Sequence, residues 1–328
     1  MRKIVFILSF AVIFGYRDIP DVVTKVGTAA AEWLKLETGI RAAGMSGAQV
    51  ASGRGVSSIS YNPSSLGYIE SQEAYFNKTN YLAGVTHNVA GYAKRINATD
   101  IIGFQTFFLD SGYMDERDEN AQYKGQFKLY GLAIQGTYTK IFTDRLKVGI
   151  SFKYIRESVK ANYLQGFAVD IGSNFDTGIY GLVLGMSVTN FGPEVQYKGD
   201  DLIKPSSNPN QLEGKTQPYP LPMTFRLGFE KQFLGSREDA LIKSSVHSLT
   251  FAADGIKPID YTVYGCMGAE YSFADMFFLR FGTHFSHDTK GPSVGFGVNL
   301  KGIKIDYAFT HYYENLGNEG QFGIEVDF

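Results

Sequence analysis

The sequence predicts an all-β protein, a transmembrane antiparallel β-barrel of about fourteen strands with an N-terminal hatch in its lumen. Three observations predict this fold. Polar and large apolar residues alternate along most segments after residue 71. Aromatic residues make up 15% of the chain, and glycine occurs 37 times. The connections between the alternating segments also vary in length in a regular order. Lipid on one face of each strand and water on the other would produce this pattern.

The final eight residues show the alternation most clearly. One face carries Phe322, Ile324, Val326 and Phe328, and the other carries Gln321, Gly323, Glu325 and Asp327. Successive side chains of a strand point to opposite faces, so each set meets one environment. This closing strand, with its terminal Phe328, also resembles the assembly signal of outer-membrane barrels. We therefore expect Phe328 to face lipid and to be needed for insertion.

Charged residues of the other predicted strands lie opposite the aromatic face. They are Lys147, Lys153, Arg226, Glu230, Arg280, Lys304 and Asp306. We expect the aromatic face to meet lipid and the charged, glycine-rich face to line the lumen. On this assignment Leu221 and Met223 face outward, and the inward Gly282 should tolerate a small side chain such as serine.

The connections favour a barrel over a soluble sandwich. Short connections are predicted at residues 143–144, 175–178, 234–239, 274–275 and 301–302. Longer ones alternate with them at residues 111–124, 192–220, 255–260, 287–292 and 313–320. Outer-membrane barrels alternate short periplasmic turns with longer outer loops, and both of their termini lie in the periplasm.

Two of the longer connections have a distinctive composition. Residues 115–119 are charged, which indicates either a patch for a cation or partner or an ordinary solvated loop. Residues 192–220 show no strand pattern and carry Asp200, Asp201, Pro205, Pro209, Pro218 and Pro220. Loops of this length are usually functional or disordered, so a lid, a docking loop and a spacer remain open.

The start of the chain predicts export to the bacterial outer membrane. An apolar run from Ile4 to Phe14 follows Arg2 and Lys3, as in a signal peptide, which we place at residues 1–15. A buried first strand is the alternative. No apolar run approaches the ~20 residues of a membrane helix. The net charge of -2 gives no basic field for nucleic acid.

Residues 16–70 are predicted to form the hatch, and residues 71–328 the barrel. The stretch 21–67 breaks the strand pattern and is rich in glycine and alanine, which allow close backbone approach. A flexible periplasmic tail is the alternative. It is disfavoured because Trp33, Leu36, Ile40 and Met45 are too apolar for a solvated linker.

Three motifs in this stretch resemble the opening of the PorV/PorQ family of FadL-like outer-membrane barrels. They read VGTAA at 26–30, GIRAAGMSGA at 39–48 and YNPSSL at 61–66. Ser46 and Ser64 stand where the family often has Gly and Ala, and both remain small. The resemblance implies a fourteen-stranded barrel with a lumenal hatch. The hatch motif consists of Arg41, Gly44, Met45, Gly47, Asn62 and Pro63.

The resemblance to the PorV/PorQ branch implies an accessory or docking role in type IX-like protein secretion. The partners would then be secretion-machinery proteins or exported cargo, besides outer-membrane lipid. The alternative, implied by the wider superfamily, is a transporter of hydrophobic small molecules across the outer membrane. A purely structural barrel with a sealed lumen is a third hypothesis.

The residues do not indicate an enzyme, a cofactor or a metal site. His284 and His287 are three apart on a predicted strand, so they should face opposite sides and not share a metal. His284 and Ser286 share a face, which we attribute to the polarity of the lumen. Cys266 falls on the inner face and is interpreted as a structural thiol.

Overall fold

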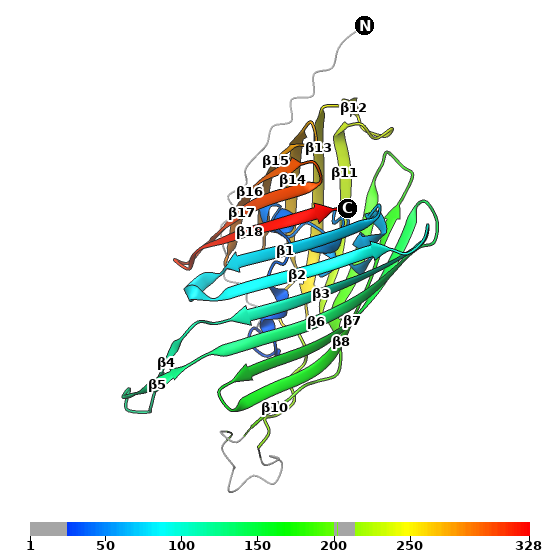
Figure 1. The fold of residues 1–328 in the computed structure, drawn as a ribbon. Coiled ribbons are helices and arrows are strands. Elements are labelled where there is room, and N and C mark those ends of the chain that lie inside the picture. Colours follow the sequence, from blue (N-terminus) through cyan, green and yellow to red (C-terminus); the bar gives the residue numbers. More distant parts are fainter. Residues whose placement is uncertain (1–24, 200–201, 203–213) are drawn as a thin grey trace.

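The computed structural model, which describes residues 25–199, 202 and 214–328, is a closed antiparallel β-barrel (Figure 1). Among these residues the main sheet has sixteen strands, of which β10 (Tyr197–Lys198) and β12 (Ile242–Lys243) are two-residue additions. The other fourteen form the ring and confirm the predicted fold class. The predicted signal peptide at 1–15 lies outside the described residues.

The ring strands follow one another in chain order. They are β1 (Gln72–Asn80), β2 (Thr86–Arg95), β3 (Asp100–Asp110), β6 (Leu129–Ile141), β7 (Leu146–Val159), β8 (Asn162–Asp176), β9 (Val183–Phe191), β11 (Thr224–Gly235), β13 (His247–Pro258), β14 (Tyr264–Phe273), β15 (Phe277–Phe285), β16 (Lys290–Leu300), β17 (Ile303–Tyr312) and β18 (Gly317–Asp327). β1 pairs with β18 from Glu73↔Asp327 to Asn80↔Gly320, which closes the ring. Closure gives the backbone polar groups of every ring strand a neighbour to pair with, as a bilayer requires.

The two faces of the wall differ as predicted. On β7, Phe152 is 57% exposed and the next residue, Lys153, is 3% exposed. On β15, Phe281 is 59% exposed, whereas Arg280 is 2% exposed. The aromatic face therefore points outward to lipid, and the charged face points into the lumen. Leu221 is an exception to the prediction. It precedes β11 and is buried in the interior.

The predicted alternation of connection lengths is only partly correct. β7 and β8 are joined by two residues, 160–161, on the side where long loops were predicted. Lys160 has a φ of 52°, and this left-handed conformation allows a tight hairpin. On the opposite side, residues 236–246 form a longer connection because β12 pairs with the end of β11. We call the side that holds the start of β1 and Phe328 periplasmic, and the other side outer.

The two distinctive outer connections contain short strands. β4 (Met114–Arg117) and β5 (Tyr123–Phe127) form a hairpin that projects beyond the ring (Figure 1). The charged stretch 115–119 lies on this hairpin, where Arg117 pairs with Asp115 and Lys160 with Glu116. β10 pairs with the outer end of β8, which corrects the prediction that residues 192–220 lack strands. Asp200 and Asp201 lie outside the described residues.

The N-terminal segment (residues 25–71) contacts the inner face of the wall (Figure 1). It contains η1 (Glu32–Lys35), α1 (Ile40–Gly44), η2 (Val56–Ser58) and η3 (Pro63–Tyr68). α1 packs on β15–β18, η2 on β1 and β2, and η3 on β3 and β6–β8. Among the described residues, no helix is long and apolar enough to cross a membrane.

Candidate functional site in the lumen

The wall carries glycine where the N-terminal segment comes closest. A Cβ atom at Gly149, Gly172 or Gly185 would overlap the segment's backbone or Asn62, and one at Gly268 would lie 2.5 Å from Met45 Cβ. Gly282 behaves in the same way, since its Cβ would overlap the Met45 backbone. The expectation that Gly282 tolerates serine is therefore wrong. The absence of a side chain at Gly282 leaves room for the backbone of the N-terminal segment. The alternation of residues along the strand does not reveal this requirement.

Asn62 and Pro63 anchor the segment to β7 and β8. Asn62 has the extended backbone that a following proline favours, with φ −157° and ψ 112°. Its Nδ2 donates to the carbonyl oxygen of Val50 (2.7 Å) and to Asn174 Oδ1 on β8 (2.6 Å). Its Oδ1 accepts from the backbone N–H of Ser64 (3.1 Å) and so caps η3. One buried amide thus joins two turns of the segment to the wall.

Arg41 joins α1 to β14 through an ion pair. Its Nε and Nη2 donate to Glu270 Oε1 at 3.0 and 2.9 Å, and its Nη1 donates to Gln49 Oε1 at 2.8 Å. Arg280 Nε also donates to Glu270, at 2.6 Å, and Arg280 Nη1 reaches Asp306 Oδ1 at 2.5 Å. Two arginines and two carboxylates therefore form one continuous charged network, in which each buried charge has an opposite partner.

The remaining residues of the motif shape the turn after α1. Met45 is fully buried against Ala252 and Cys266, which gives Cys266 a packing role. Gly47 has a φ of 83°, a left-handed conformation that favours glycine. A Cβ atom at Gly44 would lie 3.0 Å from Gly295 Cα on β16, so the two backbones are nearly in contact.

Three further ion pairs, which the sequence did not reveal, join the segment to the wall. Lys35 pairs with Asp260 (2.8 Å), Glu37 with Lys290 (3.0 Å) and Arg54 with Glu230. Burial alone would raise the pKa of Glu37, but the Lys290 ammonium and the Tyr61 hydroxyl lower it to about 2. The available signal was the set of charged residues on the inner face, which need partners. Their partners could not be identified from the sequence.

A cavity of about 260 Å³ lies between the N-terminal segment and the periplasmic halves of β1, β11, β13–β15, β17 and β18. Its charged lining side chains are Arg41, Arg54, Arg237, Arg280, Lys304, Glu230, Glu270, Asp275, Asp306 and Glu325. Positive and negative groups are equally numerous, so the cavity is strongly polar without a net charge. This half of the lumen suits water and polar groups.

The outer half of the lumen is apolar on one side, beside β2, β3 and β6–β8. Its buried side chains include Trp33, Phe107, Leu109, Leu164 and Val195, with Val85 and Leu129 packed against them. Trp33 Nε1 donates to Glu157 Oε2 on β7 at 2.9 Å, and the Tyr197 hydroxyl donates to Glu157 Oε1. These apolar side chains lie beneath the outer connections and include Trp33 of the N-terminal segment.

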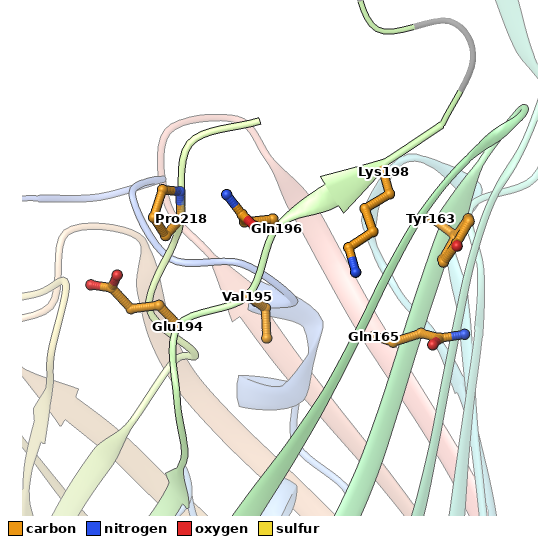
Figure 2. A pocket seen from close by; sticks show the side chains of 7 residues that line it. All are labelled: Tyr163, Gln165, Glu194, Val195, Gln196, Lys198 and Pro218. Carbon is orange, nitrogen blue, oxygen red and sulfur yellow. The ribbon is translucent and has the colours of Figure 1, made fainter. Parts of the chain in front are cut away.

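A second cavity, of about 370 Å³, lies where the wall is interrupted at its outer rim (Figure 2). The β8–β9 ladder has a register shift next to the Val169↔Phe191 pair, and the next pair along β8 is Tyr197↔Leu164. Asn190 lies at the register shift and has a φ of 58°. Pro193, between the two pairs, has no N–H to donate. The lining is mainly polar, with Gln165 from β8 and Glu194, Gln196 and Lys198 from the chain around β10.

The histidine prediction is wrong in its geometry. The rings of His284 and His287 lie 5.7 Å apart, because β15 ends at Phe285 and Ser286, with a φ of 56°, redirects the chain. Ser286 is therefore a turn residue and does not share a strand face with His284. Among the described residues, Glu73, Glu325 and Asp327 could together supply metal ligands, but Lys304 Nζ already lies 2.6 Å from Glu325 Oε1.

Phe328 follows the closing strand. Its backbone N–H donates to the carbonyl oxygen of Gln72 at 2.9 Å, so it extends the seam between β18 and β1. The residue is 68% exposed. Its role as an assembly signal stays a prediction.

The structure is similar to solved outer-membrane channels. The CymD monoaromatic hydrocarbon channel has a TM-score of 0.58 at 13% identity, covering 88% of this chain and 96% of that one. The Pseudomonas putida toluene transporter TodX has a TM-score of 0.57 at 12% identity, covering 89% of this chain and 97% of that one. A Pseudomonas aeruginosa FadL homologue has a TM-score of 0.54 at 11% identity, covering 89% of this chain and 98% of that one. No protein-family model and no curated protein matches the sequence.

These identities are low, so the likeness concerns the fold. It agrees with the closed ring, the outward aromatic face and the charged lumen described above. The chain is therefore an outer-membrane β-barrel with the fold of the FadL-like channels.

Proposed function

We propose that this barrel admits hydrophobic small molecules from the outer side of the membrane. One observation carries the proposal: the outer lumen is apolar beside β2, β3 and β6–β8, whereas the half beneath α1 is ion-paired. An apolar solute is stabilised in the first environment and not in the second. The fold shared with a toluene transporter and a monoaromatic hydrocarbon channel supports the same class of solute.

In this proposal the N-terminal segment is a hatch, and the motif residues hold it closed. Asn62 and Pro63 fix one side to β7 and β8, and Arg41 latches the other side to Glu270. Gly44, Met45 and Gly47 form the turn that packs against the glycines of β14–β16. Passage of a solute requires part of this contact to open.

The test compares the full chain with a variant that lacks residues 45–58. Cells of a host without its own hydrophobic channel should take up labelled toluene faster when they produce the full chain. In planar bilayers the deletion should raise single-channel conductance while the barrel stays heat-modifiable on detergent gels. Uptake equal to that of cells without the protein would refute the transport proposal. Unchanged conductance with an intact barrel would show that another element closes the lumen.

A docking role in type IX-like secretion is the second candidate, and the PorV/PorQ-like motifs at 26–30, 39–48 and 61–66 favour it. The projecting hairpin β4–β5 and the long connection 192–223 would supply the outer docking surface. Trimming residues 192–220 should then abolish binding of cargo or machinery proteins to the purified barrel and leave toluene uptake unchanged. The solved structures similar to this chain favour transport, since their names describe channels and a transporter.

A further inference from the structure

A small polar patch borders the apolar side chains of the outer lumen. His87 on β2 is 1% exposed, and neither ring nitrogen has a hydrogen-bond partner among the described residues. Thr79 lies directly opposite on β1, fully buried, and its hydroxyl also lacks a partner in the described part of the chain. Asn77, two residues earlier on the same face, donates to the carbonyl oxygen of Thr38 (2.9 Å), but its Oδ1 is unpartnered. We call Asn77, Thr79 and His87 the His87 patch.

Aromatic and aliphatic side chains border this patch. The ring of Trp33 lies edge-on to His87, with centroids 6.2 Å apart. The ring of Phe107 on β3 is nearly parallel to His87, at 6.5 Å and an interplanar angle of 12°. Leu109 faces His87 across the β2–β3 ladder. A solute here would meet apolar surface on most sides and hydrogen-bonding groups on one.

Unpartnered groups in such surroundings select for a hydrogen-bonding molecule. A buried donor or acceptor without a partner costs free energy, and a ligand that pairs with it removes that cost. A pure hydrocarbon would leave the patch unpaired. An ionised carboxylate would need a free cation, but Lys153, whose ammonium lies 5.8 Å from the Phe107 ring, is already paired with Asp170.

We propose that the His87 patch binds the hydroxyl group of an uncharged hydrophobic molecule, such as a cyclic alcohol or a phenol. A neutral imidazole can accept the hydroxyl proton at one ring nitrogen and donate at the other. The Thr79 hydroxyl, on the neighbouring strand, can complete the contact. This inference rests on the proposed transport function and narrows its substrate class from hydrocarbons to hydroxylated hydrophobic compounds.

Trp33 lies beside the patch and reports on it. The indole packs against Gly131, and its Nε1 donates to Glu157, so a solute bound at His87 would change the surroundings of the indole. The sequence contains a single tryptophan. Its fluorescence therefore measures binding at this place without any transport assay.

The experiment titrates the purified, folded barrel with cyclohexanol and with methylcyclohexane, which differ mainly by a hydroxyl in place of a methyl group. Dissociation constants come from Trp33 fluorescence. His87→Leu should weaken cyclohexanol binding about tenfold relative to methylcyclohexane, as expected for one lost hydrogen bond. His87→Gln should restore most of the preference, because glutamine can also donate and accept. Leu109→Met, the apolar control, should leave the ratio unchanged.

The preference ratio is the dissociation constant of methylcyclohexane divided by that of cyclohexanol. The same ratio in wild type and His87→Leu would overturn the proposal, even if both ligands bound more weakly to the variant. If His87→Leu does not assemble, Thr79→Val decides, since it removes one hydroxyl at nearly constant volume and should lower the ratio about threefold. An unchanged ratio in that folded variant would also refute the inference. Cellular uptake is measured separately. If cells take up toluene but the barrel shows no preference for cyclohexanol over methylcyclohexane, only the inference about the His87 patch is refuted. If cells take up neither toluene nor cyclohexanol, transport is refuted.

Discussion

The N-terminal segment is attached differently on its two sides. On the η3 side, the backbone of Pro63 and the amide of Asn62 lie against Gly149 and Gly172, where a side chain would overlap them. On the α1 side, ion pairs with the wall, notably Arg41 with Glu270, add to close contacts with glycines of β14–β16. Contacts set by shape respond weakly to salt, whereas charge pairs with some access to water are screened by it. The α1 side is therefore the one that changing conditions can loosen.

This difference separates the firmly anchored part of the N-terminal segment from the part that we expect to move. The amide of Asn62 makes short hydrogen bonds in a fully buried position, so it releases only at a high cost. The Arg41 and Arg54 side chains border the periplasmic cavity, where water can replace their partners. We expect opening to begin beside that cavity and to leave η3 in place.

The largest effect should come from the wall itself. Phe281→Arg places a charge on the lipid face and should cost about 2–4 kcal/mol near the membrane midplane. Phe281→Leu, its control, should cost much less. Unfolding of the barrel in detergent, followed by heat-modifiable mobility, measures both. Equal folding yields for the two variants would contradict the face assignment on which the comparison of the two sides rests.

Gly172→Ala tests the side that is held by shape. The new Cβ would overlap Asn62 Oδ1, so either the wall or the anchor must shift, at about 1–3 kcal/mol. Gly136→Ala on β6 is the matched control, because its Cβ would meet no atom within 4 Å. The denaturant midpoint should be lower for Gly172→Ala than for Gly136→Ala. Single-channel recordings should show leakage for Gly172→Ala at every salt concentration and none for Gly136→Ala. If Gly172→Ala changed neither stability nor leakage, Asn62 would not anchor the N-terminal segment.

Arg41→Gln tests the side that is held by charge. Glu270 keeps Arg280 as a partner, so the loss should be about 1–2 kcal/mol, below the ~3–5 kcal/mol of a fully orphaned buried charge. Openings of the wild-type channel should become more frequent as salt rises, and Arg41→Gln should show frequent openings even at low salt. If the variant closes as tightly as wild type, the ion pair is not a latch.

The smallest effect should be a pH dependence at the outer end of the segment. Burial, followed by the nearby Asp260, raises the pKa of Glu32 from its ordinary 4.5 to about 7. A raised carboxyl pKa stabilises the folded contact below pH 4.5, and this contribution is lost as the pH rises through 7. Glu37, lowered to about 2, stays ionised over the same range, so its contribution is lost only in acid.

Trp33 emission should therefore shift between pH 5 and pH 8, as η1 loosens next to Glu32. Glu32→Gln should flatten this change. Glu37→Gln should leave the shape of the curve unaltered, since Glu37 does not titrate in that window. A wild-type emission that is constant from pH 5 to pH 8 would show that Glu32 does not control this end of the segment.

The sequence by itself determined the ring and its two faces. Alternation along a strand is a local property, so residues such as Phe281 and Arg280 could be assigned to lipid and lumen from their neighbours alone. The change in composition before residue 71 likewise marked a segment that does not belong to the wall. The lengths of the connections were less reliable, because a single left-handed residue, Lys160, can shorten an outer loop.

Only the tertiary structure decided what meets inside the lumen. Arg41 and its partner Glu270 are 229 positions apart, and no local pattern specifies which inner carboxylate an arginine will reach. The need for glycine at Gly282 and the unpartnered nitrogens of His87 have the same origin. Each depends on how closely a second chain segment approaches the wall, and this distance is set by the packing of the whole barrel around its N-terminal segment.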